Sequence, residues 1–364
     1  MKRIIIDIGH PAHVHLYRNL IKSLQDKGNQ VIVTVKNLDS AKQLLRIYNI
    51  PFHELSKKSD SLSGKLLKQI QFDFQVLGLI RKFKIDIGLG TSITNAHVSR
   101  ISRMDSIIFD DDDDDVQPLF VKYAHPFAHC VVSPDVLKGR RKKCDTVYYA
   151  GYHELAYLHP NWFTPDLSVL KDAGVHENEP FFIMRFNAFK AHHDVGVRGL
   201  DPDQKMRLVD ILSGKGKVFI TTERDIEPGL KPYQLKVSPE KAHTLLYYAT
   251  MFVGDSQTMT SEAAVLGTPA IRCNSLVGRI SYLEEEEHKY GLTYGFKPEN
   301  FSSLLEKLNE LISMPHLKEE WQRRRQKMLA DKIDVTAFMV WFIENYPESA
   351  RTMKENPDYQ YNFK

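Results

Sequence analysis

Short strand-like apolar runs alternate with segments of helical periodicity along this sequence, and that alternation constrains the fold most. Parallel strands need a crossover connection, usually a helix, so the pattern predicts parallel sheets covered by helices. The alternation lapses over residues 158–180, a proline-bearing stretch that reads as a linker, and then restarts. We therefore expect an α/β chain with two Rossmann-like domains, whose parallel sheets face each other across a cleft, and a helical C-terminus.

The expected elements follow from the positions of these runs. In the first half the predicted strands are Ile4–Ile8, Val31–Val35, Ile85–Leu89, Ser106–Phe109 and Cys130–Val132, and the predicted helices are Ala12–Lys27, Ser40–Tyr48 and Gly64–Phe83. In the second half the strands are Phe181–Arg185, Val218–Thr222, Met251–Gly254 and Ala270–Cys273, and the helices are Pro202–Ser213, Ala242–Thr250, Met259–Gly267, Phe301–Ser313, His316–Lys332 and Val335–Tyr346.

A length of 364 residues fits two domains of common size better than one core. We predict an N-terminal domain over residues 1–165 and a C-terminal domain over 166–350 that includes the terminal helices. A polar tail, residues 351–364, is expected to be loosely held. In open parallel sheets, ligands bind beyond the carboxyl ends of the strands, so the loops there are the places to look for chemistry.

Composition argues against several classes of protein. A formal net charge of +3 is small for this length and gives no case for a nucleic-acid partner. The three cysteines lie far apart, which fits a reducing cytoplasm and neither a disulfide framework nor a metal site. No apolar run is long enough to span a membrane or serve as a signal peptide. We expect a cytoplasmic protein, at most peripheral at the inner face of the membrane, with no cofactor and no bound metal.

Three histidines follow the first predicted strand, in the segment DIGHPAHVH. Gly9 permits a tight turn, and Pro11 starts the next helix. Histidine exchanges a proton near neutral pH, so His13, at the mouth of this loop, is a candidate general base. His10 and His15 are expected to cap or pack, with Gly9 and His10 kept as residues that could line the cleft. A metal site made by the three histidines is a further alternative.

The second candidate site is GDSQTMTSEAAVLGTP, residues 254–269, where a strand runs into a helix. The free N–H groups and the positive dipole end of such a helix form an anion site, to which hydroxyl groups add donors. Glu262, further along, is placed to accept hydrogen bonds from ribose hydroxyls. A well-capped helix with an early glutamate is the alternative. The expected donor-binding residues are Asp255, Ser256, Gln257, Thr258 and Glu262, with Thr260 as an additional hydroxyl.

A third set of residues lies in FFIMRFNAFKAHHDVG. Arg185 ends a predicted strand, and Lys190 and His193 follow in the loop. A cation beside an anion site suits diphosphate binding, Arg185 most of all, while a surface arginine paired with an acid is the alternative. Glu223, after the next strand, faces the cleft by the same logic.

The uninterrupted run Asp110–Asp115 follows the predicted strand Ser106–Phe109. A carboxylate cluster can hold Mg²⁺, but such a run is more often a solvated loop, which is the expectation here. Asp110 or Asp111 could still reach the cleft, and Asp111 is included among the catalytic candidates.

The predicted helix Gly64–Phe83 mixes leucines and aromatic residues with lysines. A core-facing helix whose lysines extend into solvent is the expected structure. A face that contacts a membrane surface is the alternative.

Three segments together resemble a known family: GHPAHVH, GYHELAYLHPNWFTPD at 151–166, and GDSQTMTSEAAVLGTPAIRC at 254–273. They are similar to a bacterial and archaeal family catalogued as the domain of unknown function DUF354. The resemblance covers nearly the whole chain and implies a GT-B-like fold. Its members are often linked to surface-polysaccharide genes, but the family carries no established reaction.

The glycosyltransferase that adds N-acetylglucosamine to the lipid-linked peptidoglycan precursor shares part of this pattern. It has a glycine–histidine–valine turn after its first strand, and the similar PAHV segment implies that His13 is the active-site histidine. Its serine–glutamate pair and Gly-x-Pro turn resemble SEAAVLGTP, which implies Glu262 as the ribose ligand. Arg185 occupies the place of an arginine that contacts the donor phosphate. Its glycine-rich N-terminal loop is replaced here by HPA.

The non-hydrolysing UDP-N-acetylglucosamine 2-epimerases resemble the segment DSQTMTSEAAVLGTP even more closely. Their Gly-Thr-Arg-Pro-Glu signature after the first strand is missing here, which weighs against epimerisation.

The leading expectation is therefore glycosyl transfer from a nucleotide-diphosphate sugar, UDP-linked, to a hydroxyl acceptor that is a glycan or lipid-linked molecule. The C-terminal domain would bind the donor, and the N-terminal domain the acceptor, with His13 removing its proton. Fixed N–H dipoles and Arg185, rather than a metal, would stabilise the departing charge. A UDP-N-acetylglucosamine 2-epimerase and a non-catalytic nucleotide-sugar or glycan-binding protein are the alternatives.

Overall fold

The structure is a computed structural model that describes residues 1–364 except 56–61, 144, 187–196 and 223–225; of 62–67 and 222 it describes only the backbone. The described residues form two compact units. The first contains Met1–Trp162 and Lys332–Lys364, and the second contains Phe163–Asp331.

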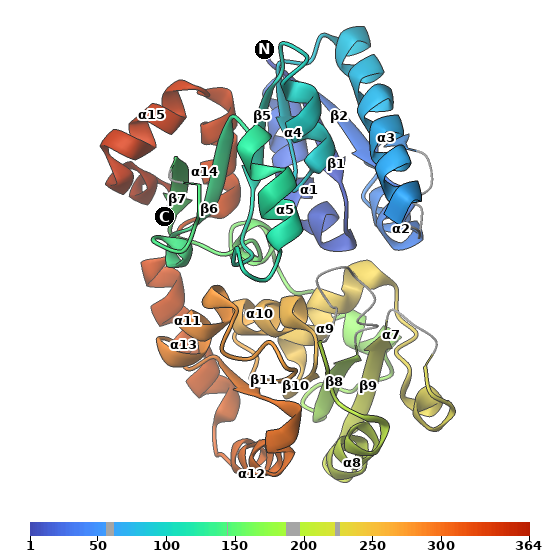
Figure 1. The fold of residues 1–364 in the computed structure, drawn as a ribbon. Coiled ribbons are helices and arrows are strands. Elements are labelled where there is room, and N and C mark those ends of the chain that lie inside the picture. The colour runs from blue at the N-terminus through green and yellow to red at the C-terminus, as the bar shows by residue number, and fades with distance from the viewer. Residues whose placement is uncertain (56–61, 144, 187–196, 223–225) are drawn as a thin grey trace. The chain divides into compact units, whose positions relative to one another are not determined.

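The first unit is built on a seven-stranded parallel sheet (Figure 1). Its strands are β1 (Arg3–Ile8), β2 (Gln30–Val35), β3 (His53–Glu54), β4 (Ile87–Leu89), β5 (Asp105–Phe109), β6 (Cys130–Pro134) and β7 (Thr146–Tyr149). They are arranged in the order β3-β2-β1-β4-β5-β6-β7. The central strand β1 reads RIIIDI and is buried from Ile4 to Ile8, because helices cover both faces of the sheet.

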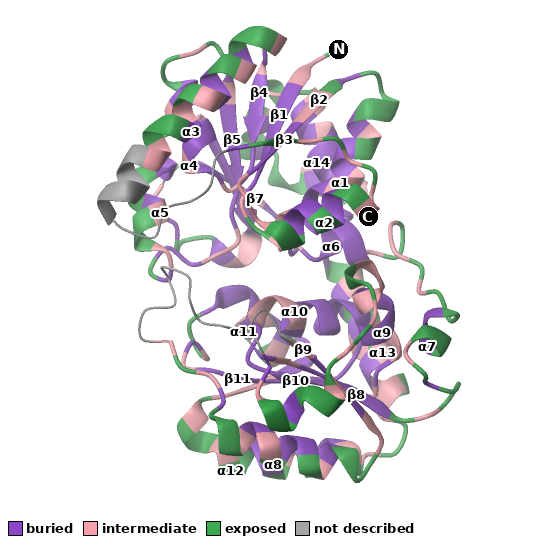
Figure 2. Cartoon of the chain, turned by 90° about the vertical axis from the view of Figure 1, so that its right-hand side faces the viewer, coloured by how far each residue is buried: buried purple, intermediate pink, exposed green. Residues whose placement is uncertain are grey.

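Helices lie on both faces of this sheet (Figure 2). They are α1 (Pro11–Asp26), α2 (Asp39–Ile47), α3 (Leu62–Phe83), α4 (Ile93–Ser99), α5 (Pro118–Tyr123), α6 (Leu155–Leu158), α14 (Val335–Glu344) and α15 (Glu348–Glu355), with 3₁₀ turns η1 (His125–Phe127), η2 (Asp135–Leu137) and η7 (Pro357–Phe363). On one face α1 packs against α2, α6 and α14, and on the other α3 packs against α4. Phe72, Val76 and Ile80 of α3 are buried in the core, as predicted for this helix.

The second unit contains a five-stranded parallel sheet in the order β12-β11-β10-β8-β9. Its strands are β8 (Phe181–Phe186), β9 (Lys217–Thr222), β10 (Met251–Gly254), β11 (Ala270–Cys273) and β12 (Thr293–Phe296). Its helices are α7 (Val169–Asp172), α8 (Pro202–Ser213), α9 (Ala242–Tyr248), α10 (Gln257–Leu266), α11 (Ser281–His288), α12 (Phe301–Ile312) and α13 (Leu317–Asp331), with 3₁₀ turns η4 (Pro228–Tyr233), η5 (Pro239–Lys241) and η6 (Pro298–Asn300). Two parallel sheets and a helical C-terminus confirm the predicted fold class. Within the described chain, no helix combines the length and apolar character that crossing a membrane requires.

The terminal helices belong to a different unit from the one predicted. Residues 332–350 were expected in the second domain, but they lie in the first. Phe338 and Phe342 of α14 are fully buried, and the Phe342 ring contacts Phe109 of β5 at 6.3 Å between centroids. The buried apolar face of α14 therefore completes the core of the first unit.

The polar tail is packed rather than loosely held. The Gln360 side-chain oxygen accepts a hydrogen bond from the Ala150 backbone N–H at 2.5 Å. The Tyr359 ring stacks on Trp341 of α14 at 4.7 Å between centroids. The prediction was wrong because the aromatic residues of the tail, although few, cover the outer side of α14.

Candidate functional site

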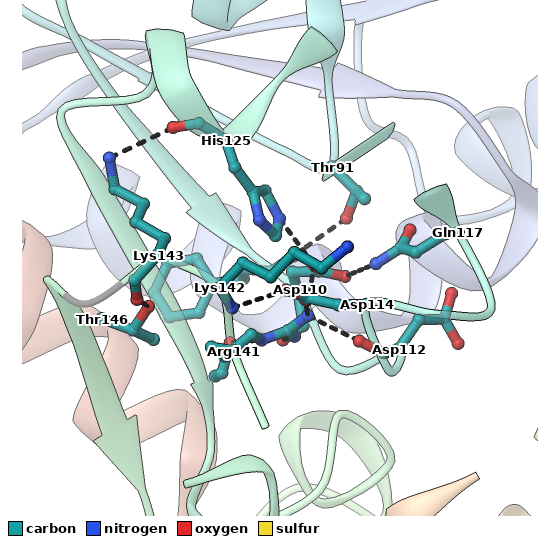
Figure 3. Close-up of polar contacts among 12 residues, drawn as sticks. Thr91, Asp110, Asp112, Asp114, Gln117, His125, Arg141, Lys142, Lys143 and Thr146 are labelled. Carbon is teal, nitrogen blue, oxygen red and sulfur yellow. Dashed lines mark hydrogen bonds and ion pairs between the residues drawn. The ribbon is translucent and has the colours of Figure 1, made fainter. Parts of the chain in front are cut away.

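Asp110, the first residue after β5, is the centre of a buried polar network in the first unit (Figure 3). One carboxylate oxygen accepts a hydrogen bond from Gln117 Nε2 at 2.6 Å. The other lies 2.8 Å from His125 Nε2 and 3.0 Å from a guanidinium nitrogen of Arg141. Burial opposes ionisation of Asp110, but the charge of Arg141 and the hydrogen bonds of His125 and Gln117 outweigh it, so the pKa of Asp110 lies below its usual value.

Arg141 holds the aspartate loop together. Its guanidinium is fully buried and donates to the backbone oxygens of Asp110 and Asp112, at 2.5 and 2.6 Å. It also donates to the Asp114 carboxylate at 2.7 Å and to the Ser133 hydroxyl at 3.0 Å. A fully used guanidinium fork of this kind fixes backbone and side chains at once.

The expectation that Asp110–Asp115 is a solvated loop is therefore wrong for most of the run. Asp110, Asp113 and Asp114 are buried, and only Asp115 is exposed. The physical reason is Arg141, which comes from the connection after β6 and supplies the compensating charge.

Asp111, a predicted catalytic residue, forms a pair with a histidine that the prediction did not include. Asp111 Oδ2 lies 3.0 Å from His153 Nδ1, and His153 follows β7 along the chain. The other ring nitrogen of His153, Nε2, is buried without a hydrogen-bond partner among the described residues. A carboxylate that holds Nδ1 fixes the ring and favours a basic Nε2, as in acid–base centres.

The pKa of Asp112 is shifted in the opposite direction from that of Asp110. Burial, and then the charges of Asp111 and Asp110, raise the pKa of Asp112 well above its usual value. Opposite pKa shifts of two carboxyl groups in one loop are common where protons are exchanged.

Asp110, Asp111 and Asp112 can each offer an oxygen atom within 4.8 Å of the others, which is a spacing that could accommodate a cation. Both oxygens of Asp110 are, however, already engaged by Gln117, His125 and Arg141. The Arg141 guanidinium supplies a positive charge beside Asp110, and Asp111 lies against His153.

Two of the histidines after β1, His10 and His15, have the capping and packing roles expected for them. His10 is the N-cap of α1, where its Nδ1 accepts a hydrogen bond from the Ala12 N–H at 3.2 Å. His15 is buried and packs on the Tyr157 ring at 5.4 Å. His13 lies in the first turn, and its Nδ1 accepts from the Gly9 N–H at 3.2 Å. The general-base role of His13 stays a prediction.

Two buried tyrosines lie close to these groups. Tyr17 packs edge-on against the His13 ring at 6.4 Å, and Tyr149 ends β7. Both hydroxyls are buried without a hydrogen-bond partner among the described residues. Burial, and next the charge of Asp111, raise the pKa of both phenols, so Asp111 acts electrostatically on each. His13, Asp111, His153 and the two phenols thus gather at the carboxyl edge of one sheet.

In the second unit, Arg185 and the start of α10 lie on neighbouring strands. Arg185 of β8 pairs in register with Gly254 of β10, and the Asp255 N–H donates to the Arg185 carbonyl at 3.1 Å. A Cβ at Gly254 would lie 2.3 Å from that carbonyl, so glycine is needed for this close approach. The backbone of Arg185 therefore lies beside the segment that leads into the N-terminus of α10, as predicted.

Two of the three hydroxyls at this helix start form hydrogen bonds within the helix. Ser256 is the N-cap, and its hydroxyl accepts from the Met259 N–H at 3.3 Å. Thr260 is fully buried and donates to the Ser256 carbonyl, so it does not face a ligand. Gln257 and Thr258 are partly exposed and keep first-turn N–H groups that a helix leaves without intrahelical partners.

Glu262 is buried in α10 and lies against α9. Its Oε1 is 2.9 Å from His243 Nε2, and both side chains are buried. This contact holds the glutamate in one position, which preorganises a carboxylate for hydrogen bonding. The ribose role of Glu262 stays a prediction. Lys190, His193 and Glu223 lie outside the described residues.

The family model described as "Protein of unknown function (DUF354)" matches residues 2–290. The chain belongs to the DUF354 family. A curated relative, the uncharacterized protein MJ0665 of Methanocaldococcus jannaschii, is 23% identical over 297 residues, which cover 78% of this chain and 85% of the relative. Family membership is therefore settled, and it brings no reaction with it.

Solved structures similar to this DUF354 protein show its fold. UDP-GlcNAc 2-epimerase from Neisseria meningitidis bound to UDP-GlcNAc has a TM-score of 0.62 at 12% identity, with 88% of this chain and 94% of that chain covered. The glycosyltransferase SsfS6 of Streptomyces sp. SF2575 has a TM-score of 0.58 at 12% identity, with 95% and 100% covered. The likenesses establish a GT-B fold, which glycosyltransferases and 2-epimerases share.

Four residues of the site region were not singled out from the sequence: His125, Arg141, His153 and His243. His153 lies in the segment GYHELAYLHP, which directly follows β7, a strand without a distinct hydrophobic pattern. The other three are partners of predicted acidic residues but lie far from them along the chain. Only the fold brings them together.

Proposed function

We propose that this DUF354 protein is a metal-independent glycosyltransferase that moves a sugar from a UDP-linked donor to a hydroxyl acceptor during surface-polysaccharide or glycoconjugate synthesis. The observation that carries the proposal is the position of Arg185 beside the N-terminus of α10, at the carboxyl ends of β8 and β10. An arginine on the strand beside the first-turn N–H groups of a helix suits a diphosphate. In this proposal the protein acts in the cytoplasm. Its acceptor is a glycan or a lipid-linked molecule.

In this proposal, the second unit binds the donor. The N–H groups of Gln257 and Thr258 and the side chain of Arg185 bind the diphosphate, and Glu262 accepts hydrogen bonds from the ribose hydroxyls. The negative charge that develops on the leaving diphosphate is stabilised by these fixed dipoles and by Arg185. His243 keeps the Glu262 carboxylate in place.

The first unit supplies the acid–base groups. His13 or His153 removes the proton of the acceptor hydroxyl as the oxygen attacks the anomeric carbon and the bond to the diphosphate breaks. Asp111 orients the His153 ring.

The first test is ligand-observed NMR of UDP-N-acetylglucosamine with the purified protein over several hours, without an acceptor. If the nucleotide sugar binds and stays intact, or is hydrolysed only slowly, the result supports a transferase whose acceptor is missing from the sample. Appearance of the 2-epimer or an elimination product would replace the proposal by the epimerase reading, which the GT-B fold also accommodates. Binding with no turnover after broad acceptor screening would indicate a non-catalytic binding protein.

The donor assignment predicts the effect of Glu262→Ala. Loss of one hydrogen bond from ribose to a charged carboxylate costs about 1.5–3 kcal/mol and should weaken UDP-sugar binding by at least about 10- to 100-fold. Calorimetric titration of the variant with UDP-N-acetylglucosamine measures this change. Glu262→Gln keeps a partner for His243 and should lose less affinity, and Glu310→Ala, on an exposed part of α12, is the control. Unchanged affinity in a folded Glu262→Ala variant contradicts the assignment.

A further inference from the structure

The face of the first unit formed by α3, α4, α5 and η1 exposes an unusual number of apolar side chains. Phe74 is 70% exposed, Ile101 is 67% exposed and Leu119 is 56% exposed. The exposed large apolar side chains of this face are Ile70, Phe74, Ile101, Leu119, Tyr123 and Phe127, and the others in the described chain are only Met1, Leu167 and Tyr361. We refer to these six residues as the apolar face. Apolar groups gathered in this way mark an interaction surface.

The helices that carry the apolar face are joined side by side. His97 of α4 lies between its neighbours: its Nδ1 is 3.5 Å from Asp73 of α3, and its Nε2 is 2.8 Å from the Tyr123 carbonyl of α5. The Phe127 ring packs on His97 at 4.9 Å, and the Phe127 carbonyl accepts a hydrogen bond from Arg100. The apolar side chains therefore stand on one continuous layer, which Figure 2 shows beside the sheet.

The exposed charged residues around the apolar face are mostly basic. Between residues 68 and 127, the charged residues that are exposed as whole residues in the described chain are the basic Arg81, Lys82, Lys84, Arg100, Arg103 and Lys122, and the acidic Asp115. The partly exposed carboxylates of Asp86 and Asp105 lie against Arg3 and His129, respectively. Basic residues at the C-terminal ends of α3 and α4 also interact favourably with the helix dipoles.

We propose that the apolar face and its basic residues bind the surface of a membrane that contains anionic lipids. Phe74, Ile101 and Leu119 would enter the boundary between head groups and acyl chains, and the basic side chains would pair with lipid phosphates. Exposed aromatic and aliphatic groups ringed by lysine and arginine are the pattern that binds such surfaces, while a protein partner would need complementary acidic side chains. The proposal is independent of the reaction catalysed.

Vesicle co-sedimentation with the full chain tests it. The protein should bind vesicles of phosphatidylcholine with phosphatidylglycerol, bind pure phosphatidylcholine much more weakly, and dissociate as salt is raised. The double variant Phe74→Glu, Ile101→Glu should lose binding at least tenfold, whereas Leu167→Glu, an exposed leucine of the second unit, should not. Both altered side chains are mostly exposed, so the variant is expected to fold, and its circular dichroism checks this.

Charge removal gives a second, matched comparison. Arg103→Gln with Lys122→Gln should weaken vesicle binding by about fivefold per residue removed. Lys215→Gln with Lys231→Gln removes the same charge from exposed sites of the second unit and should leave binding nearly unchanged. UDP-N-acetylglucosamine binding should be equal in all these variants, which separates a failure here from a failure of the proposed function.

Three results would overturn the proposal. The first is no binding of the parent protein to anionic vesicles. The second is equal loss of binding in the face variants and their second-unit controls. The third is a dimer in light scattering that Phe74→Glu, Ile101→Glu dissociates while vesicle binding stays unchanged, which would make this face a contact between two copies.

Discussion

Arg141→Met is expected to lower the free energy of unfolding of the first unit by about 3–5 kcal/mol. Methionine matches the length of the arginine stem but leaves Asp110 and Asp114 as buried carboxylates without their main cation. It also removes the donors to the carbonyls of Asp110 and Asp112. Urea denaturation followed by circular dichroism should show the transition of the first unit at lower urea and that of the second unit unmoved.

Arg140→Met is the matched control, because Arg140 is 61% exposed at the side chain and contacts Asp113 at 3.4 Å. An exposed pair of this kind contributes at most about 1 kcal/mol. Equal effects of the two substitutions would contradict a special role for Arg141.

The same substitution should change the pH dependence of stability. In the parent protein the pKa of Asp110 lies below its usual value, so its contribution is present above the unfolded pKa of about 4 and is lost as pH falls through the lower folded value. Without Arg141, burial dominates and raises the pKa of Asp110. The deficit of Arg141→Met should therefore shrink as pH falls from 7 towards about 4, and a deficit that is constant over this range would argue against this electrostatic cause.

His153→Gln is expected to reduce turnover by about 10²- to 10⁴-fold while the Kd for the nucleotide sugar stays the same. Glutamine can still donate to Asp111 but cannot take a proton. Asp111→Asn should lower turnover in the same direction, because the amide no longer stabilises a protonated ring. The measurements are single-turnover kinetics with a functional acceptor and a separate binding titration.

His129→Gln is the control for this pair. His129 also faces an aspartate, Asp105, at 3.7 Å, but at the amino ends of β5 and β6, away from the candidate site. His13→Ala should keep donor affinity and lose turnover if His13 is the base. Normal turnover in His153→Gln would show that the Asp111–His153 pair is structural and that His13 is the base. Normal turnover in His13→Ala, with loss of turnover in His153→Gln, would show that His153 is the base and that His13 is structural.

Much of the fold could be predicted because the strong elements carry their own signal. The bounds of β10, β11 and α8 agree residue for residue with the sequence pattern, since each is a compact apolar run or a helix with a clear N-cap. The strands β3, β7 and β12 were missed. β3 has only two residues, and the sequences of β7 and β12, TVYY and TYGF, are short and mix polar with aromatic residues, so none of the three shows a distinct periodicity.

The candidate site was only partly predictable for a related reason. Arg185 and the α10 N-terminus could be paired from sequence because both follow strands of one parallel sheet. The burial of Asp110 could not, because its partner Arg141 lies 31 residues away and a run of acids resembles a solvated loop until that partner is known. The Glu262–His243 contact, 19 residues apart, escaped prediction in the same way.

The return of α14 to the first unit bears on how the protein is made and dissected. The second unit is one uninterrupted stretch, Phe163–Asp331, while the first is completed only by residues near the C-terminus. During synthesis on the ribosome, the whole second unit is made before α14. The core of the first unit can therefore be completed by Phe338 and Phe342 only after the second unit has been synthesised. A fragment ending near residue 162 would expose that apolar surface and aggregate. A first unit for separate study is better obtained by replacing residues 163–331 with a short linker.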